Sequence, residues 1–143
     1  MSLLVTYDAQ NIFAKILSGA IPSARVYEDD RTLAFMDAFP QSKGHTLVIP
    51  KVDACNLFDI EPADLQNLIV ETQRIARAVR DALSPDGVRI MQFNGEAAGQ
   101  TVFHIHFHIL PMWDDQPLGR HAGGGMADIN ELNALAAQIR AKL

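Results

Sequence analysis

The chain has 143 residues, 48% of them hydrophobic, which is enough for one domain with its own core. Its formal net charge is −5, from 12 basic and 17 acidic residues, and Lys and Arg form no run. These numbers exclude the basic surface that binds a nucleic-acid polymer or an anionic membrane. We expect a single domain over residues 1–143, with neither a linker nor an internal repeat.

The cysteine count and the first ten residues bear on the compartment. Cys55 is the only cysteine, so an internal disulfide is excluded and a reducing compartment is favoured. Residues 1–10 have no cationic start and only a short apolar run, which predicts neither a signal sequence nor a membrane span. We therefore expect a cytoplasmic protein with no membrane partner.

The first half of the chain predicts a short helix followed by three strands. Apolar residues in "DAQNIFAKILS", residues 8–18, recur at helical spacing, and Gly19 stops the helix. Residues 24–37 give two β-type runs about a polar turn, and "GHTLVIP", residues 44–50, gives a third. These runs predict three consecutive antiparallel strands.

The second half predicts a long helix, two more strands and a last helix. Residues 62–83 carry an apolar stripe at helical spacing and "VRIMQF" is typical of a strand. Residues 112–125 are expected to be loop, and Asp128 precedes a helix over residues 129–142. Grouped strands with separate helices indicate an α+β fold, in which the helices pack on one side of an antiparallel sheet. The stripe of the long helix comprises Leu65, Leu68, Ile69, Ile75, Ala76, Val79 and Leu83.

The segment "QTVFHIHFHIL" places a histidine at every second position. In a strand, His104, His106 and His108 share one face, and the alternate apolar residues are sufficient to bury the other face. The histidines would then have no packing role. A solvated polar face stays possible, although three histidines are a costly way to make one.

A metal site and a phosphate site are the functional alternatives for this row. In a straight strand His104 and His108 lie roughly 13 Å apart, whereas zinc ligands all lie within ~2.1 Å of one ion. A phosphate suits the row better, because one neutral imidazole can attack while a neighbour donates a proton. The preceding loop "NGEAAGQT" is either a hairpin connection or an anion-binding loop, in which backbone N–H groups, Gln100 and Thr101 are donors.

The segment "AGQTVFHIHFHILP" resembles the signature of the histidine triad (HIT) superfamily. The segment "NIFAKILSGAIPSARVYEDDRTLAFMDAFPQSKGHTLVIPK" extends the likeness to its Hint-like branch, over residues 10–112, and leaves a loop and helix at 113–143. The resemblance implies a HIT-like fold of about five antiparallel strands, a long helix and short terminal helices. It also implies a homodimer that hydrolyses purine nucleoside phosphoramidates or related nucleotide conjugates through a nucleotidyl-histidine.

The resemblance assigns roles to individual residues. It makes His106 the nucleophile, His108 the contact to the α-phosphate and leaving group, His104 an orienting residue, and His45 a fourth histidine nearby. Asp37 would accept from ribose hydroxyls, although a turn role is equally open from the sequence. The remaining predicted nucleotide contacts are Ile12, Phe13, Ile16 and Phe35 around the base, for which core packing stays open, and Asn94, Gly99, Gln100 and Thr101 around the phosphate.

Three departures from relatives bear on metals. Many relatives have two cysteines and a histidine that build a structural zinc site, where this chain has Asn11, Ala14 and Asp53. We therefore predict no structural zinc and no cofactor. Phe93 stands where relatives often have an asparagine, so one of the phosphate contacts of those relatives is not expected here.

The alternative functions are a dinucleoside polyphosphate hydrolase, a nucleotide-sensing dimer without catalytic activity, and a metal-binding protein. An AMP-like purine nucleotide is the expected ligand.

Overall fold

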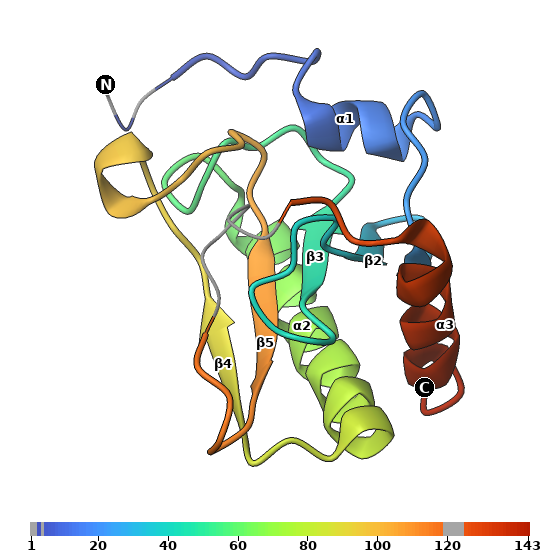
Figure 1. Ribbon diagram of the computed structural model, residues 1–143. Helices are drawn as coiled ribbons and strands as arrows, with labels where there is room; N and C mark the ends of the chain where they lie inside the picture. The colour runs from blue at the N-terminus through green and yellow to red at the C-terminus, as the bar shows by residue number, and fades with distance from the viewer. Residues whose placement is uncertain (1–2, 4, 119–124) are drawn as a thin grey trace.

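The sheet predicted from the sequence is present and has five antiparallel strands. The computed structural model describes residues 3, 5–118 and 125–143. The strands lie in the order β1-β2-β3-β5-β4, so β3 and β5 are neighbours at the centre although the long helix separates them in the chain (Figure 1). The strands are β1 Arg25–Glu28, β2 Thr32–Met36, β3 Thr46–Pro50, β4 Gly87–Met91 and β5 Phe107–Met112.

Three α-helices and one short 3-10 helix complete the described chain, which confirms the α+β prediction. They are α1 Ile12–Leu17, α2 Pro62–Leu83, η1 Glu96–Ala98 and α3 Ile129–Arg140. The bounds of α2 are those predicted, because Pro62 suits the first helical turn and the apolar period continues to Leu83. Helix α1 begins later than predicted, because the Asn11 side chain accepts from Ala14 N and caps the helix there.

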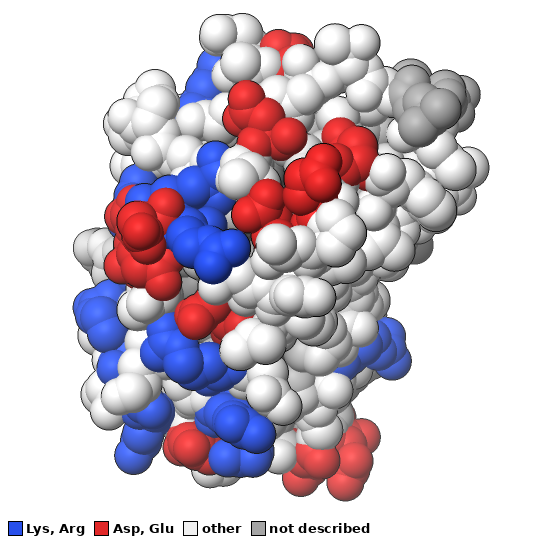
Figure 2. All heavy atoms as spheres, turned by 180° about the vertical axis from the view of Figure 1, so that it is seen from behind, with Lys and Arg blue, Asp and Glu red and all other residues white. Residues whose placement is uncertain are grey.

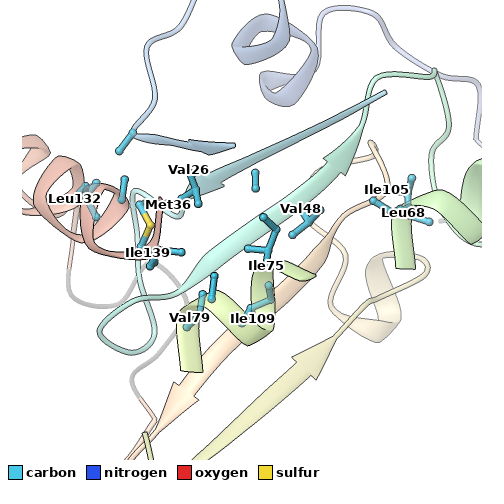
Figure 3. Packing of buried hydrophobic residues seen from close by; sticks show 14 of the residues in the cluster. Val26, Met36, Val48, Leu68, Ile75, Val79, Ile105, Ile109, Leu132 and Ile139 are labelled. Carbon is cyan, nitrogen blue, oxygen red and sulfur yellow. The ribbon is translucent and has the colours of Figure 1, made fainter. Parts of the chain in front are cut away.

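Each face of the sheet has its own core, so the prediction that the helices pack on one side of the sheet is wrong. On one face α2 and α3 pack against side chains of the strands, which include Val26, Met36, Val48 and Ile109 (Figure 3). On the other face α1 inserts its buried residues between the alternate side chains of β2 and β3. This alternation is what a strand buried on both sides requires. The second core comprises Phe13, Ile16, Leu33, Phe35, Leu47 and Ile49.

One predicted core position on α2 is wrong. Ile69 is 42% exposed, while Leu68 and Ile75 are fully buried. The opposite flank of the helix faces β1 and β2, because Asn67 donates to Thr32 Oγ1 and the Arg74 guanidinium lies 4.1 Å from the centre of the Tyr27 ring. Ile69 therefore faces the β4 side, where no described element covers it.

Charges of both signs are interspersed on the surface. In Figure 2 acidic side chains interrupt the basic ones on the face shown, and Arg74–Glu71 and Arg80–Asp81 are ion pairs along α2. This agrees with the absence of a basic run in the sequence. None of the helices in the described ranges has the length and apolar character that a bilayer crossing needs.

Gly44, which immediately precedes His45, is closely packed against Leu83 and Pro111. Its φ is +88°, and a Cβ at this position would collide with Leu83 Cδ1 and lie 3.2 Å from Pro111 Cγ. Gly19 has a similar φ of +85° but open space around it. We predict that Gly44→Ala lowers the free energy of unfolding by about 2 kcal/mol or more, because backbone strain and overpacking add.

Gly19→Ala is the matched control and is expected to cost only the backbone term, about 1 kcal/mol. Urea denaturation with an unchanged m-value measures both variants. Equal losses in the two variants would show that Leu83 and Pro111 move aside at no cost.

Candidate active site

The histidine segment is not the continuous strand that the sequence predicts. Strand β5 begins at Phe107, so only His108 lies in the sheet, and residues 101–106 have no regular structure. The ladder with β3 ends at Val48↔Phe107: in the same register Pro50 would lie opposite Ile105, but Pro50 has no N–H to donate, and the Ile105 N–H bonds to Ala54 O instead. The alternative of a solvated polar face is excluded, because His104, His106 and His108 are all buried.

Hydrogen bonds fix the tautomer of His106. Its Nδ1 lies 2.7 Å from the main-chain oxygen of His104, and a carbonyl can only accept, so Nδ1 carries the proton. The lone pair of the neutral ring is then on Nε2. The Phe13 ring stands nearly perpendicular to this imidazole, with centroids 4.8 Å apart, and limits its rotation. His106 therefore has its nucleophilic lone pair on Nε2, in a ring whose orientation these contacts fix.

His45 and His108 form a second fixed pair. The main-chain N–H of Gln41 donates to His45 Nδ1 at 3.1 Å, so the proton of neutral His45 is on Nε2. That Nε2–H donates to His108 Nδ1 at 2.9 Å. Neutral His108 consequently carries its own proton on Nε2. Its ring centroid lies 4.9 Å from that of His106, so the ring with a proton on Nε2 lies beside the ring with a lone pair on Nε2.

Asp37 lies close to His45 and His108, and these three residues could together bind a metal ion. Asp37, His45 and His108 place one potential ligand atom each within 4.8 Å of one another. A metal on His45 Nε2 would move the ring proton to Nδ1, where it would face the Gln41 N–H. The donor set of this cluster therefore favours a hydrogen-bonded relay over a cation. Asp37 Oδ2 lies 3.5 Å from His45 Nε2, and Oδ1 accepts from Phe39 N at 2.8 Å.

His104 is braced on both ring nitrogens. Its Nε2–H donates to Pro50 O at 2.8 Å, and its Nδ1 accepts from the Tyr7 hydroxyl at 2.6 Å. Burial lowers the pKa of His104, against the raising effects of the Pro50 hydrogen bond and of Asp53. Burial likewise raises the pKa of Tyr7, so both groups are neutral. The sequence alone did not identify Tyr7, because it lies outside every predicted element.

The predicted phosphate loop is folded around Gln100. The amide of Gln100 donates to Cys55 O at 2.7 Å and Val102 O at 3.1 Å, and it accepts from Gly95 N at 2.8 Å. Its main-chain N–H donates to Gly95 O. All donors of Gln100 are thus used within the protein, and it braces the loop rather than presenting a donor. A direct phosphate contact by this side chain would need these bonds to break.

The other loop residues differ in what they offer. Asn94 ties the loop to its neighbours, since its Oδ1 accepts from Leu57 N and from Gln92 Nε2, both at 2.8 Å. Gly99 has a φ of +104° and ends η1, and Thr101 is exposed just after it. Phe93, where relatives often have asparagine, stacks obliquely on His108 with centroids 5.5 Å apart. The phosphate contacts of Asn94, Gly99 and Thr101 stay predictions.

Three of the four predicted base contacts lie in the second core. Phe13, Ile16 and Phe35 are buried, while Ile12 on the outer side of α1 is 45% exposed. The packing role, which the sequence left open for Phe13 and Phe35, is therefore established. Contact with a base stays a prediction for all four. Asn11 and Asp53, two of the positions that differ from zinc-binding relatives, lie beside Tyr7 and act on its pKa.

Comparison with known proteins identifies the family. The HIT domain family model matches residues 18–114. The Hit-like protein of Bartonella henselae, described as involved in cell-cycle regulation and solved with an unknown ligand, is 46% identical, with a TM-score of 0.89 over 96% of this chain and 100% of that chain. The chain therefore belongs to the HIT family.

Two curated relatives agree with this assignment. The protein named Protein hit of Bacillus subtilis is 47% identical over 71% of this chain and 70% of that protein. The adenylylsulfatase HINT3 of Arabidopsis thaliana is 35% identical over 78% of this chain and 59% of that protein. These matches confirm the resemblance that the histidine segment indicates.

The lowered pKa of His104 predicts a pH dependence of stability. Below about pH 6.5 the unfolded chain protonates this histidine, whereas the folded protein resists protonation until the lower folded pKa is reached. The unfolded state then binds more protons, so the free energy of unfolding falls as the pH falls through this window. His104→Asn keeps one donor and one acceptor but does not titrate, and we predict a shallower fall.

Urea denaturation of both proteins at about five pH values between about 7.5 and 5 gives the free energy of unfolding as a function of pH. The slopes of the two curves are then compared. All other residues are the same in the two proteins, so the comparison isolates His104. Parallel curves would show that His104 has an ordinary pKa in the folded state.

Proposed function

We propose that this protein is a nucleotide hydrolase that cleaves purine nucleoside phosphoramidates or related nucleotide conjugates at the α-phosphate through a nucleotidyl-histidine. The observation that carries the proposal is the pairing of His106 and His108. One presents a lone pair on Nε2, the other a proton on Nε2, and their rings are 4.9 Å apart. Nucleophile and acid are thus side by side before any ligand binds.

In the first step Nε2 of His106 forms a bond to phosphorus. The bond from phosphorus to the leaving amine, sulfate or phosphate breaks, and that group leaves with the electron pair. His108 donates a hydrogen bond from Nε2–H to the leaving atom and stabilises the charge that develops there, and a leaving amine takes its proton from water. His45 holds His108 in this orientation, because its Nε2–H donates to His108 Nδ1 at 2.9 Å.

In the second step water attacks phosphorus and the bond to His106 Nε2 breaks. A proton of this water passes to the solvent, which balances the proton taken up by the leaving group, restores the starting state of the site and releases the nucleoside monophosphate. The carbonyl of His104 holds His106 in the same orientation for both steps. Main-chain N–H groups of residues 101–103 make no hydrogen bond to other described residues, so they can stabilise phosphoryl oxygens.

Nucleotide specificity is proposed to depend on Asp37 and α1. A carboxylate oxygen can accept more than one hydrogen bond, so ribose hydroxyls can donate to Asp37, whose contacts include Phe39 N and His45 Nε2. Exposed Ile12 supplies apolar surface at the outer side of α1 for a base. HINT3, named an adenylylsulfatase, supports cleavage beside an adenylyl phosphate.

The test is the covalent intermediate. Rapid quenching with an adenosine phosphoramidate, followed by peptide mass spectrometry at neutral to alkaline pH, is expected to find an adenylyl group on His106. His106→Ala is expected to lower turnover by about 10⁴-fold or more. AMP binding should change less than about tenfold, because Asp37 and the outer surface of α1 remain.

A substrate panel separates the alternatives. Faster hydrolysis of diadenosine polyphosphates would make this a dinucleoside polyphosphate hydrolase, and AMP binding with no turnover of either class would make it a sensor. An adduct on His104 or His108 instead of His106 would contradict the assignment of the nucleophile.

We also propose that the protein forms a homodimer through the β4 edge, in a reducing compartment such as the cytoplasm that suits its buried Cys55 thiol. Val88 and Ile90 are 37% and 44% exposed. Ile90 pairs with Ile109, whose side chain lies in the core beneath α2, so the exposed apolar residues Val88 and Ile90 both lie on the α2 face of the sheet. Exposed Ile69 faces the same side, and a second copy would cover all three.

Ile90→Asp is predicted to convert this dimer into monomers, because it would bury two unpaired carboxylates at a two-fold interface. Ile129→Asp is the matched control: Ile129 is 48% exposed but starts α3, on the β1 and β2 side of the molecule. Sedimentation velocity at micromolar concentration compares the two. A monomeric wild type, or a dimeric Ile90→Asp, would contradict the interface.

A further inference from the structure

Residues 101–106 present the nucleophile from a segment that the sheet does not hold. Within it, Ile105 N–H donates to Ala54 O at 2.9 Å, which fixes one point of the main chain. The orientation of His106 depends on the neighbouring carbonyl of His104, which accepts its Nδ1–H at 2.7 Å. Whatever fixes residue 104 therefore also fixes the direction of the attacking nitrogen.

The Tyr7 hydroxyl is one of the two groups that hold the His104 ring. It donates to Nδ1 at 2.6 Å, and the two rings are edge to face with centroids 5.6 Å apart. The other group is Pro50 O, at the end of β3, 2.8 Å from Nε2. His104 is fully buried, so water cannot replace either partner without entering the core.

Tyr7 itself lies in the segment that precedes α1, described at residues 3 and 5–11 and called the N-terminal arm below, rather than in a helix or strand. The arm lies along residues 54–56, because Cys55 Sγ donates to Val5 O at 3.5 Å and Asn56 Nδ2 donates to Leu3 O at 3.2 Å. The same arm leads into α1, whose Phe13 stands against the His106 ring. The arm and α1 thus approach His104 and His106 from the same part of the chain.

We infer that Tyr7 is a positioning residue for the nucleophile: its hydroxyl fixes the His104 ring, and the carbonyl of His104 then aims Nε2 of His106. Tyr7 donates to His104 and reaches the reacting atoms only through it. Its role therefore concerns the rate of bond formation rather than nucleotide affinity. This inference deepens the proposed hydrolase function and rests on it for its kinetic part.

Tyr7→Phe keeps the ring and removes the donor. We expect kcat to fall about tenfold while KM and AMP affinity change less than twofold, because a buried acceptor is left unsatisfied away from the nucleotide. The adenylyl adduct on His106 should form more slowly by the same factor. Tyr27→Phe is the matched control: the chain has two tyrosines, and the Tyr27 hydroxyl donates to Asp29 Oδ2 at 2.9 Å.

Nitrogen NMR of the histidine rings provides a readout that does not depend on activity. In the wild type, His104 should show a protonated Nε2 and a hydrogen-bonded, unprotonated Nδ1. In Tyr7→Phe the Nδ1 resonance should move toward the frequency of a nitrogen that accepts no hydrogen bond, and the resonances of His106 should change with it. In Tyr27→Phe both residues should keep their wild-type frequencies.

Unchanged His104 and His106 resonances in Tyr7→Phe would overturn the inference, as would a kcat equal to that of Tyr27→Phe. A wild type that neither turns over the substrate panel nor forms an adduct would instead refute the hydrolase proposal. The NMR comparison would still decide the role of Tyr7 in that case. If Tyr7→Phe does not fold, the wild-type spectrum alone decides, because a protonated Nδ1 on His104 would exclude the Tyr7 donor.

Discussion

The site depends on one hydrogen bond, from Nδ1 of His106 to the main-chain oxygen of His104. A neutral imidazole has one proton and one lone pair, and this bond assigns the proton to the inner nitrogen and the lone pair to the outer one. The Gln41 N–H donates to His45 Nδ1 and so places the His45 proton on Nε2. That proton is donated to His108 Nδ1, which places the His108 proton on Nε2. Main-chain groups therefore determine which ring nitrogen carries the proton in His106, His45 and His108, although the three side chains are chemically identical.

Such a buried polar network stabilises only when every member is satisfied. His45 and His104 have no exposed surface, and each bonds through both ring nitrogens. A partner lost from such a network costs more than the average hydrogen bond contributes, because the remaining group cannot bond to water. The same bonds that hold the rings in place thus restrict which substitutions the core tolerates, and they explain why Tyr7 is tied to the site.

Local patterns in the sequence predicted the elements but not the surroundings of the site. Helix α2 and the three first strands follow from periodicity and turn residues, which act over short distances. The alternation around His104 and His106 also predicted a strand, but the ladder stops where Pro50, more than fifty residues away, has no N–H. Burial of the histidines, the brace by Tyr7 and the engaged amide of Gln100 are tertiary contacts between distant segments, which no local pattern contains.

The central position of β3 beside β5 has a consequence for how the protein is made. His45 and His108 are 63 positions apart, and the whole of α2 and β4 lies between them. Their contact closes a long loop, so its entropic cost is met only when the intervening elements have packed. During synthesis the N-terminal strands can pair early, whereas the relay is completed only after β5 has left the ribosome. The chain therefore acquires its chemistry in the last stage of folding, and incomplete translation products lack it.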